Sequence, residues 1–330
     1  MDTAYKLYDT IRKFSETTIE NRYHVVSLPG KLHKLGVSEE GYPKFFVGTS
    51  DNNLMQNLNA EILSVEYNIL CSIIDEETVS DDQYFTIITL RSDNEQLHKM
   101  FIDVFLMMLN SLPAKPSNIQ IATKVENLLS IFAKLKRRPV HKIQGLWAEL
   151  LLIEQSKNPT TAARAWHASP NAKYDFAMGG DKVEVKSTKS ENRLHQFSLD
   201  QLNPSANSRL LICSVVVRES ALAENGLSVF DLYDRIARKV LDSDVRIHVS
   251  EVMADTLGSD FYTAGQKHFD YVEGCDRLAL FDYVDVPKIT RESVPEHVTE
   301  VRFTSDLTHL QDIRVVGYDK DNSDLFNAIY

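Results

Sequence analysis

Hydrophobic residues in positions 1–135 follow two patterns, one typical of strands and one typical of helices. Runs rich in β-branched and aromatic residues predict strands at 44–50, 61–70 and 83–90. Apolar residues then recur at helical spacing, which predicts helices over 93–112 and 117–135. The stretch 112–118 between these helices contains two prolines, Pro113 and Pro116. We therefore expect an N-terminal α+β domain, 1–115, followed by a second domain, 116–330.

The segment 142–155, KIQGLWAELLLIEQ, predicts a buried helix. Its positions 146–153 are apolar on nearly every side, as in a helix that packs all round. Glu149 is the only charged residue among them. Because a buried carboxylate is costly without a partner, Glu149 must be paired, bound to a metal, or directed into a cleft.

The rest of the second domain mixes strand and helix patterns. Residues 160–169 are expected to form a strand, 189–196 a polar linker, and 208–219 a central strand. Ser198 and Gln201 have the spacing of a capping box, which predicts a short helix ended by Pro204. The last expected elements are an amphipathic helix over 229–241 and β-rich stretches at 270–286 and 299–307.

A tight hairpin is predicted at YDFAMGGDKVEVKST, residues 174–188. Gly179 and Gly180 suit a two-residue type I′ turn, which requires positive φ at both positions. The register that follows pairs Phe176 with Val183 and places Asp175 opposite Glu184. Alternation along the strand adds Lys186 to the same face as Glu184.

Two facing carboxylates repel each other, so a hairpin shaped only for stability would favour opposite charges there. A divalent cation removes this penalty, since Mg²⁺ is usually held by one or two carboxylates together with waters and phosphates. The alternative is a solvated hairpin face with scattered charges. Both interpretations stay open on the residues alone.

Composition narrows the class of protein. The 330 residues are 43% hydrophobic and 25% charged, which is normal for a chain that buries a core. No apolar run is long enough for a membrane span, and residues 1–14 lack the apolar stretch of a secretory signal. The three cysteines form no zinc-binding pattern. We therefore expect a cytoplasmic protein with no membrane association.

The net charge of −11 argues against a uniformly basic surface for nucleic acid, so DNA binding requires a local basic patch. One candidate patch is 134–142, with Lys136, Arg137 and Arg138. A second follows the hairpin and contains Lys189 and Arg193. Either stretch is also compatible with a solvated face. His141, His167 and His195 are each isolated in sequence, which favours structural roles over metal ligation.

The order of elements from 142 to 219, with Glu149 on a helix, Asp175 on a strand and E-x-K at Glu184 and Lys186, resembles the PD-(D/E)XK nuclease superfamily. Tyr174 stands where the motif name has proline. The resemblance implies a restriction-endonuclease-like α+β core with a mixed central sheet flanked by helices. It also implies that Asp175, Glu184 and Glu149 bind the metal, that Lys186 acts beside the attacking water, and that Gln201 is an accessory residue.

The activity implied by the resemblance is hydrolysis of DNA phosphodiester bonds with Mg²⁺, for which Mn²⁺ can substitute. Stretches such as GLWAELLL and VEVKST are also similar to bacterial PD-(D/E)XK motif proteins, whose genes lie near ATPases and methyltransferases in restriction or anti-phage clusters. Two alternatives remain open: a non-catalytic DNA- or protein-binding subunit on a nuclease fold, and a repair nuclease that resolves junctions as a homodimer.

Overall fold

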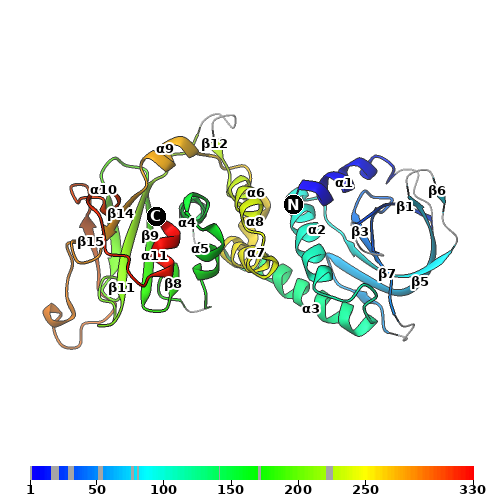
Figure 1. The fold of residues 1–330 in the computed structure, drawn as a ribbon, viewed down its shortest axis with the longest axis horizontal. Coiled ribbons are helices and arrows are strands. Elements are labelled where there is room, and N and C mark those ends of the chain that lie inside the picture. The colour runs from blue at the N-terminus through cyan, green and yellow to red at the C-terminus, as the bar shows by residue number, and fades with distance from the viewer. Residues whose placement is uncertain are drawn as a thin grey trace. The chain divides into compact units, whose positions relative to one another are not determined.

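The structure is a computed structural model that describes residues 2–15, 22–28, 33–50, 55–75, 78–79, 82–140, 142–169, 172–220 and 226–330. The chain forms two compact units, Met1–Lys136 and Arg137–Tyr330, and Figure 1 labels most of their elements. The division falls after Lys136, whereas the sequence predicted it after residue 115. The difference arises because α3 (Asn118–Lys134) packs against α2 (Glu95–Asn110) within the first unit.

The first unit contains a closed ring of five strands. The ring runs through β1 (Arg22–Ser27), β2 (Lys34–Val37), β3 (Pro43–Val47), β7 (Gln83–Leu90) and β5 (Leu63–Asp75). It closes because β1 pairs antiparallel with β2 and parallel with β5. The short strands β4 (Leu58–Asn59) and β6 (Thr78–Val79) also pair with β5.

Helices pack against this ring. Phe45 of β3 contacts Phe101 and Phe105 of α2, with ring centroids 5.4 and 5.1 Å apart. α1 (Asp2–Arg12) contacts β1, β2 and α2. The strands predicted at 44–50, 61–70 and 83–90 and both predicted helices are confirmed. The sequence did not predict β1 and β2, so the closure of the ring was missed.

The second unit is built on a mixed four-stranded sheet in the order β14-β11-β9-β8. The central strands β9 (Asp181–Thr188) and β11 (Arg209–Val216) are parallel. The outer strands β8 (Phe176–Met178) and β14 (Ala279–Asp282) pair antiparallel with them. This arrangement confirms the predicted mixed sheet and the central position of the strand at 208–219.

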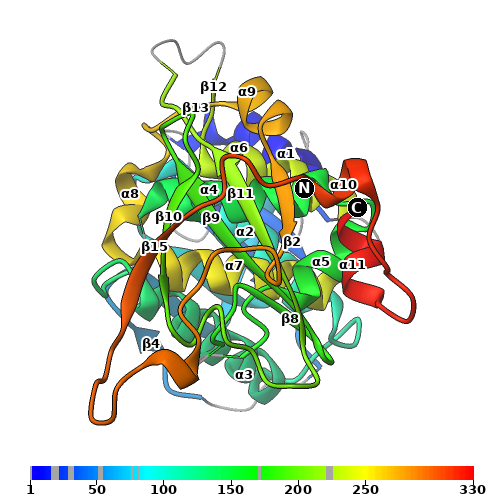
Figure 2. The ribbon, with the colours of Figure 1, turned by 90° about the vertical axis from the view of Figure 1, so that its left-hand side faces the viewer.

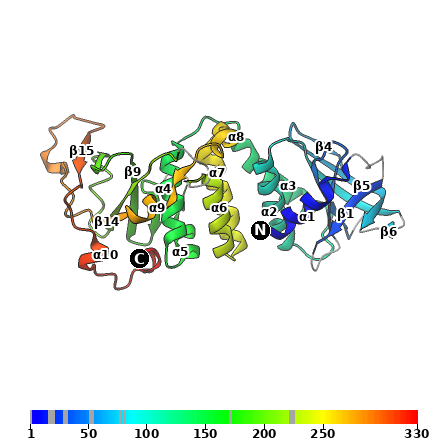
Figure 3. The same ribbon diagram turned by 90° about the horizontal axis from the view of Figure 1, so that it is seen from above.

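Helices cover one face of this sheet in two layers. α4 (Ile143–Gln155) and α5 (Pro159–Ala165) contact β9 and β8, respectively. α6 (Val229–Lys239) and α7 (Ser243–Leu257) pack on the outer side of α4 and α5, as Figure 3 shows. Ten of the thirteen α4 residues are buried, which confirms the predicted core helix.

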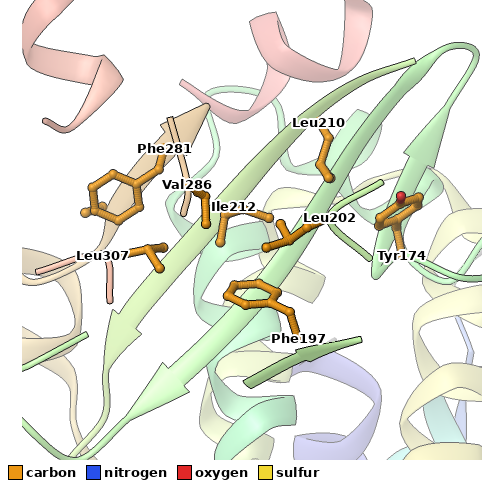
Figure 4. Packing of buried hydrophobic residues seen from close by; sticks show 9 residues of the cluster. Tyr174, Phe197, Leu202, Leu210, Ile212, Phe281, Val286 and Leu307 are labelled. Atoms are coloured by element: carbon orange, nitrogen blue, oxygen red, sulfur yellow. The ribbon is translucent and has the colours of Figure 1, made fainter. Parts of the chain in front are cut away.

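A two-stranded ribbon covers the other face. β10 (Leu194–Ser198) pairs antiparallel with β15 (Arg302–Asp306), beside the sheet in Figure 2. Between ribbon and sheet lies an apolar cluster, shown in Figure 4: Tyr174, Phe197, Leu202, Leu210, Ile212, Ala279, Phe281, Val286 and Leu307. The remaining elements are β12 (Gly226–Leu227), β13 (Phe269–Asp270), α8 (Phe261–Ala264), α9 (Tyr271–Asp276), α10 (Ile313–Val316) and α11 (Asp324–Ile329).

Several sequence predictions in this unit are wrong. The expected β-rich stretch 270–286 contains helix α9 at Tyr271–Asp276 before strand β14 at Ala279–Asp282. Residues 160–169 form mainly helix α5 rather than a strand, because Asn158 caps the Thr161 N–H and Pro159 begins the helix. The expected linker 189–196 contributes to β10, whose ladder partner is the distant strand β15. The segment after Ser198 is a turn rather than a helix.

Candidate active site

The predicted hairpin forms at β8 and β9. Phe176, Ala177 and Met178 pair with Val183, Lys182 and Asp181, which confirms the predicted register for these three pairs. Gly179 has a φ of +56°, but Gly180 lies outside the left-handed region. The type I′ turn is therefore wrong, and positive φ at the first position alone matches a type II′ turn.

Asp175 lies directly before β8, outside the ladder that was expected to place it opposite Glu184. Its Oδ2 accepts a hydrogen bond of 2.7 Å from the backbone N–H of Val185, next to Glu184. Burial raises the pKa of Asp175 well above its usual value, and the charges of Glu149 and Glu184 raise it further. The two acids thus interact electrostatically although they are not a ladder pair.

Glu184 and Lys186 lie on one face of β9, in register with Ile212 and Ser214 of β11. The Lys186 ammonium is 2.7 Å from Glu184 Oε1, and it lies 5.2 Å from the centre of the Phe197 ring. Glu184 Oε2 is buried and has no hydrogen-bond partner in the described structure. Burial raises the pKa of Glu184, Lys186 opposes this shift, and Glu149 adds to it.

Gln201 reaches Glu184 from the turn that follows β10. Its Nε2 donates a hydrogen bond to Glu184 Oε1, the same oxygen that contacts Lys186. Both hydrogen bonds of a capping box hold Gln201: its backbone N–H reaches Ser198 Oγ, and its Oε1 accepts from the Ser198 N–H. The predicted pairing of Ser198 and Gln201 therefore forms without the predicted helix.

Glu149 and His167 complete the site from the helical face. Glu149 is 6% exposed, and its Oε2 accepts from the indole N–H of Trp166 at 2.8 Å and contacts His167 Nε2 at 3.0 Å. Glu149, His167 and Asp175 each offer one ligand atom, and these atoms lie within 4.8 Å of one another. Glu184 lies outside this group of three. The structure thus brings together one site, with Glu184 and Lys186 beside the three-ligand group.

Sequence reasoning missed His167. Its backbone N–H donates to the Asp175 carbonyl at 2.8 Å, and Trp166 forms an isolated antiparallel bridge with Phe176. The chain between α5 and β8 therefore folds back so that the residue after Trp166 meets the residue before Phe176. No local pattern predicts this pairing. His195 is a buried structural histidine that contacts Ser214 Oγ at 2.7 Å, while His141 falls outside the described residues.

Four of the five predicted DNA-contact residues are engaged in other contacts. Arg137 pairs with Asp255 at 3.4 Å, Lys189 pairs with Glu219 at 2.6 Å, and Lys136 pairs with Glu61. Arg193 donates to the backbone carbonyls of Ser214 and Arg277 and to Ser214 Oγ. Arg138 is exposed. None of these residues is among the ligand cluster or the hydrogen-bond partners of Glu184 described above.

A divalent cation fits the residues of this site. Glu149, Asp175 and Glu184 can carry three negative charges in a buried setting, whereas Lys186 supplies one positive charge. Glu184 Oε2 is buried and has no partner within the described ranges, and a cation or an ordered water would satisfy it. Oxygen-rich carboxylate sets are the ligands that Mg²⁺ and Mn²⁺ prefer.

Residues 15–308 match a family whose description reads "Putative PD-(D/E)XK family member, (DUF4420)". The chain belongs to this family. The PD-(D/E)XK membership gives it a nuclease-type fold, in agreement with the mixed sheet and flanking helices. No curated protein and no solved structure matches the chain. Among the described residues, none of the helices has the length and apolarity needed to cross a membrane.

Proposed function

We propose that this PD-(D/E)XK protein is a metal-dependent DNA endonuclease that serves in a bacterial restriction or anti-phage system. The observation that carries the proposal is Glu184, which is 3% exposed and lies beside Lys186. One of its carboxylate oxygens has no hydrogen-bond partner among the residues that the structure describes. A stability-driven core would complete this group with donors from the chain. Family membership supports hydrolysis as the chemistry.

Each residue of the site has a distinct task in this proposal. Asp175, Glu149 and Glu184 would hold the cation, which would supply Lewis-acid polarisation of the scissile phosphodiester. Lys186 would place its ammonium beside the reacting phosphate and stabilise the negative charge that develops there. Gln201 would keep Glu184 Oε1 occupied, so that Oε2 faces the ligand.

DNA delivery by a partner protein is part of the proposal. The net charge is −11, and several predicted DNA-contact residues already pair with acids. A basic partner, such as an ATPase or methyltransferase subunit, would supply the electrostatic attraction that this chain lacks. Cleavage is therefore expected to be weak for the isolated chain and stronger in the complete system.

The test compares plasmid, linear and single-stranded DNA, with and without Mg²⁺ or Mn²⁺, for the isolated chain and the complete system. Lys186→Ala should lower the cleavage rate by about 10²–10³-fold, as expected for loss of one electrostatic group. Lys182→Ala is the matched control, because Lys182 lies on the same face of β9 and donates to the Gly179 carbonyl instead.

Cleavage by Lys186→Ala at the wild-type rate would refute the assigned site. A wild-type protein that binds DNA or its partners but does not cut in the complete system would favour the non-catalytic subunit. Selective cutting of four-way junctions by a tight homodimer would favour the repair nuclease.

A further inference from the structure

We propose that His167 is a nitrogen ligand of the cation and that it makes this site select Mn²⁺, or another first-row transition cation, over Mg²⁺. The inference deepens the proposed function and rests on the same metal site. It concerns a residue whose sequence context predicted only a structural role.

The spacing of the ligand atoms supports direct coordination. One atom each from Glu149, His167 and Asp175 lies within 4.8 Å of the other two. His167 Nε2 and Glu149 Oε2 are 3.0 Å apart. Adjacent ligands of an octahedral cation at about 2.1 Å also lie about 3.0 Å from each other. The two atoms therefore already have the separation that a shared cation requires.

The backbone at His167 is held in a conformation that a histidine rarely adopts. Its φ is +41°, in the left-handed region, which is sparsely populated for residues other than glycine and persists when the surroundings enforce it. The backbone N–H of His167 donates a hydrogen bond to the Asp175 carbonyl. Such conformations cluster at functional sites. Here the conformation belongs to the residue whose ring contacts Glu149.

The neighbouring Trp166 holds this backbone in place. Trp166 is fully buried, and its indole N–H donates to Glu149 Oε2 at 2.8 Å. Its carbonyl oxygen contacts His248 Nε2 at 2.6 Å, and its backbone bridges Phe176. Glu149 and His167 are thus positioned by one rigid segment, which provides the preorganisation that a metal site needs.

Charge balance favours a neutral ligand beside the three carboxylates. When all three carboxylates are ionised, as direct ligation of a cation requires, they and Lys186 together carry a charge of −2, which one divalent cation neutralises. A fourth carboxylate would leave excess negative charge in a buried region, whereas neutral imidazole adds a ligand without adding charge. Imidazole nitrogen also binds first-row transition cations better than Mg²⁺, which prefers oxygen. Cation choice would therefore follow from His167.

A purely structural role for His167 predicts a different result. In that case the contact with Glu149 only stabilises a buried acid, and the cation would be bound by oxygen atoms alone. Replacement of His167 would then alter stability without changing the preference between Mn²⁺ and Mg²⁺. Measurements of binding and spectra separate these two roles without relying on DNA cleavage.

The experiment loads the full-length protein with Mn²⁺ and records pulsed electron paramagnetic resonance for ¹⁴N coupling. Wild type should show nitrogen coupling, and His167→Asn should lose it. Asparagine is a suitable replacement because it tolerates the left-handed region. His297→Asn is the matched control, since His297 also has positive φ, +66°, and is exposed. It should retain the wild-type signal.

Titration calorimetry completes the test. His167→Asn should weaken Mn²⁺ binding by about tenfold or more, with a smaller change for Mg²⁺, so that selectivity falls. Absence of ¹⁴N coupling in wild type, or coupling and selectivity unchanged in His167→Asn, would overturn the inference. If wild type shows the coupling but never cuts DNA, the nuclease proposal fails and the His167 ligand stands. If wild type cuts DNA but shows no ¹⁴N coupling, the nuclease proposal stands and the assignment of His167 as a ligand fails.

Discussion

Two buried glutamates on α4 differ in the hydrogen bonds and positive charges that the chain provides for their carboxylates. Glu154 is 4% exposed and Glu149 is 6% exposed. Glu154 is bound by Lys239 at 2.7 Å, by the Gln155 amide at 2.6 Å and by the Tyr271 hydroxyl at 2.9 Å. Glu149, five residues earlier, contacts the side chains of Trp166 and His167 but no lysine or arginine in the described part of the chain. It shares its surroundings with two further acids, Asp175 and Glu184.

The pKa shifts around these two glutamates run in opposite directions. At Glu154, burial alone raises the pKa, but hydrogen bonds from Lys239, Gln155 and Tyr271 outweigh burial and bring the pKa below its usual value. Around Glu149, the pKa values of Asp175 and Glu184 are raised, first by burial and then by neighbouring acids. A buried acid such as Glu154, whose charge is balanced by groups of the same chain, has a structural role. The acids Glu149, Asp175 and Glu184 have too little positive charge around them, which suits them to bind an external cation.

The largest expected effect on stability comes from a mutation in the cluster around Glu154. Lys239→Met leaves Glu154 without its cation, and we expect a loss of about 2 kcal/mol at pH 7, because Lys239 is partly exposed and the full cost of a broken buried pair is reduced. Chemical denaturation measures this loss.

The same comparison has a pH dependence with a defined sign. Because the folded pKa of Glu154 is lowered, its contribution is complete above the unfolded value near 4.5 and disappears as pH falls through the folded pKa. The difference between wild type and Lys239→Met should therefore shrink on acidification below pH 4.5. An equal difference at pH 7 and pH 3 would show that Glu154 is not the structural acid described here.

Replacement of one acid in the group of Glu149, Asp175 and Glu184 should change the free energy of unfolding in the opposite direction. Asp175→Asn keeps an acceptor for the Val185 N–H but removes one of the interacting charges, so it should stabilise the metal-free protein by about 1 kcal/mol or less. A cation at ten times its Kd stabilises wild type by about 1.4 kcal/mol, and the variant should gain much less.

Calorimetry should show a crossing: the variant melts above wild type in EDTA and below it in millimolar Mg²⁺ or Mn²⁺. Each kcal/mol shifts Tm by about 2 °C or less for a chain of this size, so replicate scans are needed. Parallel shifts in both conditions would mean that Asp175 is not a ligand and that the contrast with Glu154 fails.

The smallest effect concerns the surface charges. Alanine at Lys136, Arg137 and Arg138 should weaken DNA binding for all sequences alike and flatten its salt dependence by about 0.9 per lost phosphate contact. Arg138→Ala should account for most of the change, since Lys136 and Arg137 pair with acids. An unchanged slope would assign this stretch to a solvated face or a protein interface.

The sequence by itself determined the local framework of the site. The glycine pair at 179–180 and the alternating flanks were enough to predict the hairpin, its register and the shared face of Glu184 and Lys186, because a two-residue loop leaves few pairings open. The apolar surroundings of Glu149 predicted its burial. The strands at 44–50, 61–70 and 83–90 in the first unit were predicted from their β-branched and aromatic residues.

Only the tertiary structure decided the remaining features, since they depend on contacts between distant segments. β10 is a strand because β15, about a hundred residues later, supplies its partner. Residues 160–165 are helical because a cap and a proline outweigh the strand preference of Thr160 and Thr161. His167 enters the site through a bridge between Trp166 and Phe176, which no sequence period encodes. Local patterns specify strands, turns and buried faces, whereas long-range packing alone brings Glu149, His167 and Asp175 within reach of one cation.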